Sequence, residues 1–183
     1  MEEYFDILDE LGNPTGEVRT RKDAHALGLW HKAVHIWIIN DKNEILLQRR
    51  CATKDSYPNK LDISCAGHLS SGDDSVTGAL RELKEELNLE VKEKDLKYLV
   101  TLKQQCVYKE TFINNEYIDM YLLRTDKDVS DMKFQEEEIS EIFYVSFDKF
   151  REMYENKQKD FIIYEDEFPI LFEIFDEIKK GDN

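Results

Sequence analysis

The sequence predicts an α/β fold with a mixed β-sheet and helices on its faces. Short apolar runs rich in β-branched and aromatic residues alternate with segments of helical periodicity. Hydrophobic residues make up 41% of the 183 positions, which suffices for one sizeable core. No linker rich in proline, glycine or serine interrupts the chain. We therefore predict a single domain over residues 1–183.

The first 30 residues predict an N-terminal hairpin extension. An apolar segment at residues 4–8 is typical of a strand, and the turn sequence DELGNPTG separates it from a second short strand at residues 17–20. The runs VHIWIIN and ILLQR, at residues 34–40 and 45–49, flank DKNE and predict another hairpin.

The remaining elements follow in alternating order. We expect strand segments at residues 61–64, 98–108, 117–124 and 142–145. Ser146 is a suitable N-cap for a helix over residues 147–156, and residues 166–180 predict a C-terminal amphipathic helix.

An acidic helix is expected at about residues 74–87. Its apolar positions recur three and four residues apart, as on a helix face that packs against a core. Three carboxylates project from another side of the same helix, within an arc of about 100°. The apolar set is Val76, Ala79, Leu80, Leu83 and Leu87, and the acidic set is Glu82, Glu85 and Glu86.

These carboxylates repel one another as neighbours on a helix, and a divalent cation would reverse that effect. Mg²⁺ prefers oxygen ligands and is usually held by one or two carboxylates together with substrate phosphates. Arg81 lies next to Glu82 in the sequence and four residues before Glu85, close enough to orient a carboxylate. A solvated helix surface is the alternative explanation of the run LKEEL.

The longer segment GHLSSGDDSVTGALRELKEELNL, residues 67–89, resembles the signature of the Nudix hydrolase family, G-x5-E-x7-R-E-U-x-E-E-x-G-U, where U is a bulky aliphatic residue. Two positions depart from the signature: Asp73 replaces a glutamate and Asn88 replaces a glycine. Asn also tolerates the left-handed conformation that ends helices, whereas Asp73 has a shorter reach. The matching positions are Gly67, Arg81, Glu82, Leu83, Glu85, Glu86 and Leu89.

The resemblance implies an α/β/α sandwich and a metal-dependent hydrolase of diphosphate bonds. Glu82, Glu85, Glu86 and the carbonyl of Gly67 would bind Mg²⁺ or Mn²⁺. Glu82, Glu85 and Arg81 are the candidate catalytic residues. The expected substrate is a small molecule in which a nucleoside diphosphate is linked to another group.

The flanking sequence, about residues 6–150, is similar to the Nudix branch that includes isopentenyl diphosphate isomerase. In that branch histidines and two glutamates bind a metal, and His25, His31, His68 and Glu116 stand in comparable places. The second glutamate is replaced here by Asn114. The resemblance therefore makes these four residues candidates for a second site.

Two other functions remain open beside hydrolysis. One is isomerisation of isopentenyl diphosphate, with Cys65 and Glu116 exchanging protons. Cys65 is displaced by one residue from the isomerase position, and a slip of one residue turns a strand side chain to the opposite face. The other is a Nudix-fold protein that binds a diphosphate without cleaving it. The intact acidic helix favours hydrolysis over both.

Residues outside the motif would choose the substrate. Arg49 and Arg50, at the end of a strand, are candidates for phosphate contacts. We expect the segments 53–60 and 103–115 to contact the group attached to the diphosphate, and one glutamate of residues 136–138 to assist the metal or the attacking water. The aromatic residues of these segments make a homodimer a candidate assembly.

Charge and cysteine content exclude several other classes. A formal net charge of −15 disfavours nucleic acids, whose binding depends on clustered Lys and Arg. The apolar runs are too short to cross a bilayer, and the N-terminus lacks the pattern of a signal peptide. Three cysteines without a C-x-x-C pair predict free thiols. We therefore expect a cytoplasmic protein that does not associate with membranes.

Overall fold

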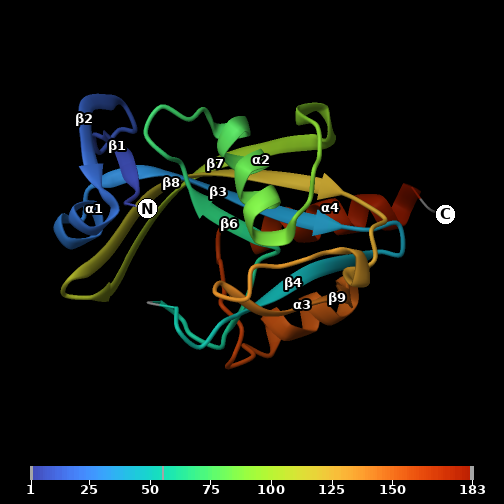
Figure 1. Cartoon of the computed structure of the whole chain (residues 1–183). Coiled ribbons are helices and arrows are strands. Elements are labelled where there is room, and N and C mark those ends of the chain that lie inside the picture. Colours follow the sequence, from blue (N-terminus) through green and yellow to red (C-terminus); the bar gives the residue numbers. More distant parts are fainter. Residues whose placement is uncertain (1, 55, 182–183) are drawn as a thin grey trace. The chain divides into compact units, whose positions relative to one another are not determined.

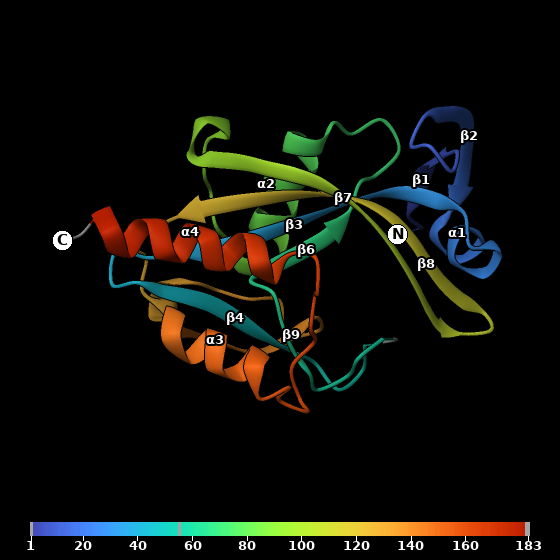
Figure 2. The ribbon, with the colours of Figure 1, turned by 180° about the vertical axis from the view of Figure 1, so that it is seen from behind.

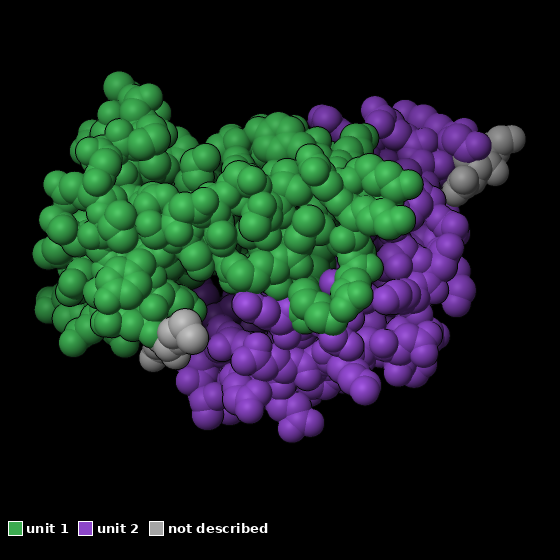
Figure 3. All heavy atoms as spheres, turned by 45° about the horizontal axis from the view of Figure 1, so that its top comes forward, with its two compact units in different colours: residues 1–36, 66–84, 90–122 green, residues 37–65, 85–89, 123–183 purple. Residues whose placement is uncertain are grey.

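The computed structural model describes residues 2–54 and 56–181, which form two compact units (Figure 3). Unit 1 comprises residues 1–36, 66–84 and 90–122, and unit 2 comprises residues 37–65, 85–89 and 123–183. The prediction of a single domain remains a prediction.

Unit 1 begins with the expected hairpin, in which β1 (Tyr4–Leu8) pairs antiparallel with β2 (Pro14–Thr20) (Figure 1). Within residues 1–30 the hairpin is followed by a short helix, α1 (Arg21–Leu27), which was not predicted from the sequence. The Thr20 side chain accepts a hydrogen bond from the Asp23 amide, and Gly28 ends the helix in the left-handed conformation. The cap pattern was present in the sequence, but the helix has only seven residues and shows little periodicity.

The rest of unit 1 is built around the first part of β3 (Trp30–Ile39). This strand pairs with β1, with β6 (Cys65–His68) and with β8 (Phe112–Arg124). β8 in turn pairs with β7 (Leu96–Lys109), which follows the short 3₁₀ helix η1 (Glu93–Asp95). β7 and β8 extend beyond the predicted ends, and Gly67 lies within β6.

The acidic helix is α2 (Ser75–Leu87), within one residue of the predicted start and with the predicted end. Asp74 caps it, since its Oδ1 accepts a hydrogen bond of 2.8 Å from the Thr77 amide. Asn88 has φ 52°, so it ends the helix in the left-handed conformation as expected. Ala79, Leu83 and Leu87 are fully buried, which confirms the apolar face.

Unit 2 centres on β4 (Glu44–Arg50). The end of β3 pairs with its start, Ile39 opposite Ile45, which confirms the predicted hairpin. β5 (Leu61–Asp62) and β9 (Ile139–Ser146) also pair antiparallel with β4. The short 3₁₀ helix η2 (Val129–Asp131) precedes β9. Leu61 forms an additional parallel bridge with Phe161.

Two helices complete unit 2. α3 (Phe147–Glu155) lies beside β4 and β9 in both views (Figures 1 and 2), and the Ser146 side chain caps it as predicted. α4 (Phe168–Gly181) begins two residues later than predicted. The helices pack through aromatic rings, with Phe147 and Phe175 stacked at 3.8 Å between centroids. The buried Trp37 donates a hydrogen bond of 2.7 Å from Nε1 to Glu167.

Two absences apply to the described residues. Cys51, Cys65 and Cys106 are free thiols, as predicted. None of the helices within residues 2–54 and 56–181 combines the length and apolar character that a membrane span requires.

Candidate functional site

Arg81 joins three segments of unit 1. Its Nη1 donates to Glu82 Oε1 at 2.7 Å, and its Nη2 donates to the His68 carbonyl at 2.9 Å. Its Nε lies 3.3 Å from Asp73 Oδ2. Asp73 therefore contacts the arginine directly despite its shorter side chain. Arg81 is placed to orient Glu82 rather than to act alone, because its planar group binds several acceptors at once.

The Glu82 carboxylate occupies the space that a side chain at Gly67 would fill. A Cβ atom built on Gly67 would lie 2.0 Å from Glu82 Cδ and within 2.4 Å of both its oxygens. Only a residue without a side chain permits such a close approach of the carboxylate to the backbone of β6. The geometry explains why glycine is needed at this position of the motif.

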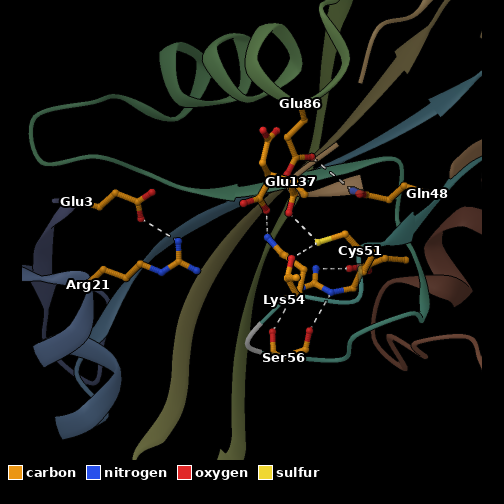
Figure 4. Close-up of polar contacts among 12 residues, drawn as sticks. Glu3, Arg21, Gln48, Cys51, Lys54, Ser56, Glu86 and Glu137 are labelled. Atoms are coloured by element: carbon orange, nitrogen blue, oxygen red, sulfur yellow. Dashed lines mark hydrogen bonds and ion pairs between the residues drawn. The ribbon is translucent and has the colours of Figure 1, made fainter. Parts of the chain in front are cut away.

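The last turn of α2 belongs to unit 2 and contains the other two acidic residues. Glu85 is exposed, whereas Glu86 is buried, with 8% of its surface exposed. Gln48 Nε2 lies 3.4 Å from Glu86 Oε2, and the Gln135 amide donates to the Glu86 carbonyl at 3.0 Å (Figure 4). A buried carboxylate costs free energy unless its charge is compensated, and a divalent cation is one group that compensates it.

The structure brings three predicted histidines together in unit 1. The ligand atoms of His25, His31 and His68 all lie within 4.8 Å of one another. His31 and His68 stack on Phe5, with ring centroids 4.9 and 4.8 Å away. His25 stacks on Phe112 at 4.4 Å. We call His25, His31, His68 and Glu116 the histidine cluster.

Glu116 supplies the carboxylate of the histidine cluster. Its Oε1 lies 3.0 Å from His68 Nε2 and 3.8 Å from His31 Nε2. His31 Nδ1 lies 2.8 Å from the Leu29 carbonyl, which can only accept, so the ring proton is on Nδ1. Nε2 of His31 is buried and has no hydrogen-bond partner among the described residues. This arrangement leaves a buried nitrogen lone pair available.

The buried surroundings keep two of the imidazoles, those of His25 and His31, neutral. Burial lowers the pKa of His25 to about 3 and the pKa of His31 to about 4, and the proximity of His68 contributes to both shifts. Burial alone would raise the pKa of Glu116. The hydrogen bond and charge of His68, with His31 nearby, outweigh it and hold that pKa at about 2. Neutral imidazoles beside an ionised carboxylate are a suitable donor set for a metal ion.

The two arginines proposed as phosphate contacts are already paired in unit 2. Arg49 lies 3.3 Å from carboxylate oxygens of both Glu141 and Asp160. Arg50 donates to the buried Asp62 at 2.8 Å and to both the carbonyl and the hydroxyl of Ser56. Arg50 therefore has a structural role between β4 and the segment that follows it.

Sequence reasoning missed the part of unit 2 around Cys51. This thiol and Lys54 both contact the acidic segment 137–138 (Figure 4). A lone cysteine gives no spacing signal, so only the structure reveals the contact. In unit 1, the ion pair of Glu3 with Arg21 at 2.9 Å was likewise not predicted (Figure 4).

Comparison with known proteins places this geometry in a family. Residues 29–164 match the NUDIX domain. The chain is 37% identical over 179 residues to Nudix hydrolase 3 of Arabidopsis thaliana, a match that covers 94% of this chain but only 23% of that protein. It is 28% identical over 156 residues to isopentenyl-diphosphate Delta-isomerase 2 of Photorhabdus laumondii, covering 85% and 84% of the two chains. The Nudix resemblance and its isomerase-like branch are confirmed.

A solved structure supports the fold. The protein DR0079 of Deinococcus radiodurans has a TM-score of 0.63 and 23% identity to this chain, covering 79% of it and 83% of that protein. At this identity the likeness concerns the fold alone. It confirms the predicted class, an α/β fold of the Nudix type.

The close approach at Gly67 predicts a cost for any side chain there. Gly67→Ala would force the Glu82 carboxylate out of its place, and we expect the free energy of unfolding to fall by about 1–3 kcal/mol, as for other overpacked sites. Urea unfolding followed by circular dichroism measures the change. Gly181→Ala is the control, because a Cβ there meets nothing within 4 Å. Equal stability of the two variants would contradict the packing.

The histidine pKa values predict a loss of stability in weak acid. Between the unfolded value of 6.5 and the folded values of about 4 and about 3, only the unfolded chain takes up these protons. Stability is therefore fully present above pH 6.5 and falls as the pH falls. The slope is at most about 1.4 kcal/mol per pH unit for each histidine.

Urea unfolding in EDTA at pH 7, 6 and 5 measures this slope without bound metal and above the range in which ordinary carboxylates titrate. His31→Asn should flatten the dependence. A free energy of unfolding that stays constant from pH 7 to 5 would show that His25 and His31 are not buried from solvent as they are in the structure.

Proposed function

The chain belongs to the Nudix family, and we propose that it is a Mg²⁺- or Mn²⁺-dependent hydrolase that cleaves the diphosphate bond of a nucleoside diphosphate linked to another group. The observation that carries the proposal is the seating of the Glu82 carboxylate against Gly67. A carboxylate that Arg81 holds against the backbone of β6 is oriented before any ligand binds, and its oxygens are of the kind that a divalent cation prefers.

The residues fit a hard divalent ion. Glu82, Glu85 and Glu86 lie on one helix, α2, and would hold the ion together with the Gly67 carbonyl. Carboxylate and carbonyl oxygens are the ligands that Mg²⁺ prefers. When bound, the ion would neutralise phosphoryl oxygens and lower the pKa of a water molecule.

The chain's own groups would do the remaining work. Arg81 fixes Glu82, so that no entropy is lost in ordering that carboxylate when substrate binds. Gln48 holds Glu86 in the same way. A glutamate accepts the proton of the attacking water, with Glu82, Glu85 and one residue of 136–138 as the candidates.

A hydrolysis panel tests the proposal. We expect Mg²⁺-dependent release of products from at least one member of a set comprising nucleoside diphosphates, nucleotide sugars, dinucleotides and isopentenyl diphosphate. Glu86→Gln removes a negative charge and keeps the shape, so kcat/KM should fall at least about 100-fold. Product analysis by ion-exchange chromatography measures both.

Glu90→Gln is the matched control. Glu90 is exposed, follows α2 and pairs with Lys84, so its loss should change kcat/KM by less than about twofold. Movement of the double bond of isopentenyl diphosphate without hydrolysis of any panel member would support the isomerase instead. Thermal stabilisation by a diphosphate without turnover would support the binding protein.

The histidine cluster favours a second metal site beside α2. Its donors are imidazole nitrogens with one carboxylate, and His31 Nε2 is buried without a hydrogen-bond partner among the described residues. Nitrogen donors suit Zn²⁺ or Mn²⁺ better than Mg²⁺. We propose that this second ion either serves the hydrolase or marks the isomerase alternative, in which Glu116 would exchange protons.

Calorimetric titration of EDTA-treated protein with Zn²⁺, Mn²⁺ and Mg²⁺ tests the second site. We expect one Zn²⁺ per chain to bind to wild type and to Glu86→Gln alike, and His31→Asn to weaken binding at least about tenfold. Lys32→Asn, at the exposed neighbouring position, is the control. Zn²⁺ binding that depends on Glu86 but not on His31 would rule out this site.

A further inference from the structure

The acidic loop, residues 135–138, is tied to the end of α2 within unit 2. The Gln135 amide donates to the Glu86 carbonyl at 3.0 Å. Inside the loop, the amides of Glu138 and Ile139 both donate to the Gln135 carbonyl at 2.9 Å. The loop thus has a defined backbone, although Glu136 and Glu137 are exposed. Its carboxylates are held near a residue of the proposed metal site.

Cys51 holds the same loop from the other side. Its amide donates to the Glu138 carbonyl at 2.9 Å, and its thiol donates to the Glu137 carbonyl at 2.7 Å (Figure 4). Because a carbonyl only accepts, the thiol proton lies on this contact. Thr53 Oγ1 lies 3.0 Å from the sulfur on a further side. Cys51 is 6% exposed, so water cannot easily replace these contacts.

The segment that contains Cys51 is itself fixed. Arg50 bonds to Ser56 and to the buried Asp62, which also accepts a hydrogen bond of 2.7 Å from Tyr164. Lys54 forms an ion pair with Glu138 (Figure 4). Residues 50–54 and Ser56 therefore support the acidic loop, with one neutral contact at Cys51 and one charged contact at Lys54.

We propose that Cys51 is a positioning residue for hydrolysis, which holds the acidic loop through the Glu137 carbonyl so that a glutamate of the loop meets the attacking water. The catalytic role of Cys51 rests on the proposed function. The contact between Cys51 and the acidic loop is independent of it. The thiol donates directly to the Glu137 carbonyl, which is the contact through which it would act.

Two substitutions at residue 51 distinguish the effect of losing the hydrogen bond from the effect of changing the side-chain volume. Cys51→Ala removes the donor and keeps the backbone bond to Glu138, whereas Cys51→Ser keeps a donor on a slightly shorter bond. If Cys51 had only a structural role, both substitutions would lower the stability of the protein, and neither would lower kcat specifically. A positioning cysteine loses kcat in the alanine variant and recovers it in the serine variant.

Steady-state kinetics on the best substrate of the panel tests this. We expect Cys51→Ala to lower kcat about 5- to 20-fold, a fraction of what a general base contributes, with KM within about twofold. Cys51→Ser should return kcat to within about threefold of wild type. Ser130→Ala, at an exposed position of η2, is the control and should leave both constants unchanged.

Hydrogen exchange distinguishes this idea from the proposed function. The amides of Glu138 and Ile139 should exchange at least about fivefold faster in Cys51→Ala than in wild type or Cys51→Ser. Faster exchange in a protein that hydrolyses nothing would leave the contact standing and overturn only the hydrolase. Unchanged exchange, or equal kcat in Cys51→Ala and wild type, would overturn the positioning role.

Discussion

The hydrogen bonds of Arg81 are the constraint on which the acidic end of unit 1 depends. One cation joins Glu82 of α2, Asp73 of the preceding loop and the carbonyl of His68 at the end of β6. A lysine could not make these contacts together, because it lacks the planar fork. The absence of a side chain at Gly67 then lets the Glu82 carboxylate lie against β6. The arginine at position 81 and the glycine at position 67 thus determine the position of the Glu82 carboxylate together.

The histidine cluster has a different energetic basis. The imidazoles of His25 and His31 are buried and uncharged, so the folded chain avoids the cost of burying two positive charges. Phe5 stacks on both His31 and His68, whose ring centroids lie 5.2 Å from each other. Phe5 itself belongs to the core with Ile7 and Ala24, so the N-terminal hairpin and α1 build a wall of this cluster. The extension is therefore part of the candidate site rather than an appendage.

Much of the architecture could be predicted from local patterns. The spacing of its apolar residues predicted helix α2, and the tolerance of asparagine for the left-handed conformation predicted its end at Asn88. The N-cap residue Ser146 predicted α3. Helix α1 was missed because seven residues give too little periodicity. The roles of Arg50 and Cys51 were not predictable, since their partners lie far along the chain or on the backbone. Sequence spacing reports local geometry, whereas these contacts are set by tertiary structure.

The replacement at Asn114 changes what the histidine cluster can do. Its Oδ1 lies 3.0 Å from His25 Nε2, and an amide oxygen only accepts, so the His25 proton lies on Nε2 and the lone pair on Nδ1. A glutamate here would accept the same bond but add a second negative charge near Glu116. With Asn114 the cluster has one carboxylate beside its imidazoles, a set that favours a nitrogen-preferring ion over Mg²⁺. In the proposed hydrolase, phosphate-bound Mg²⁺ would then be left to the oxygen donors of α2, which would separate the two candidate metals by chemistry.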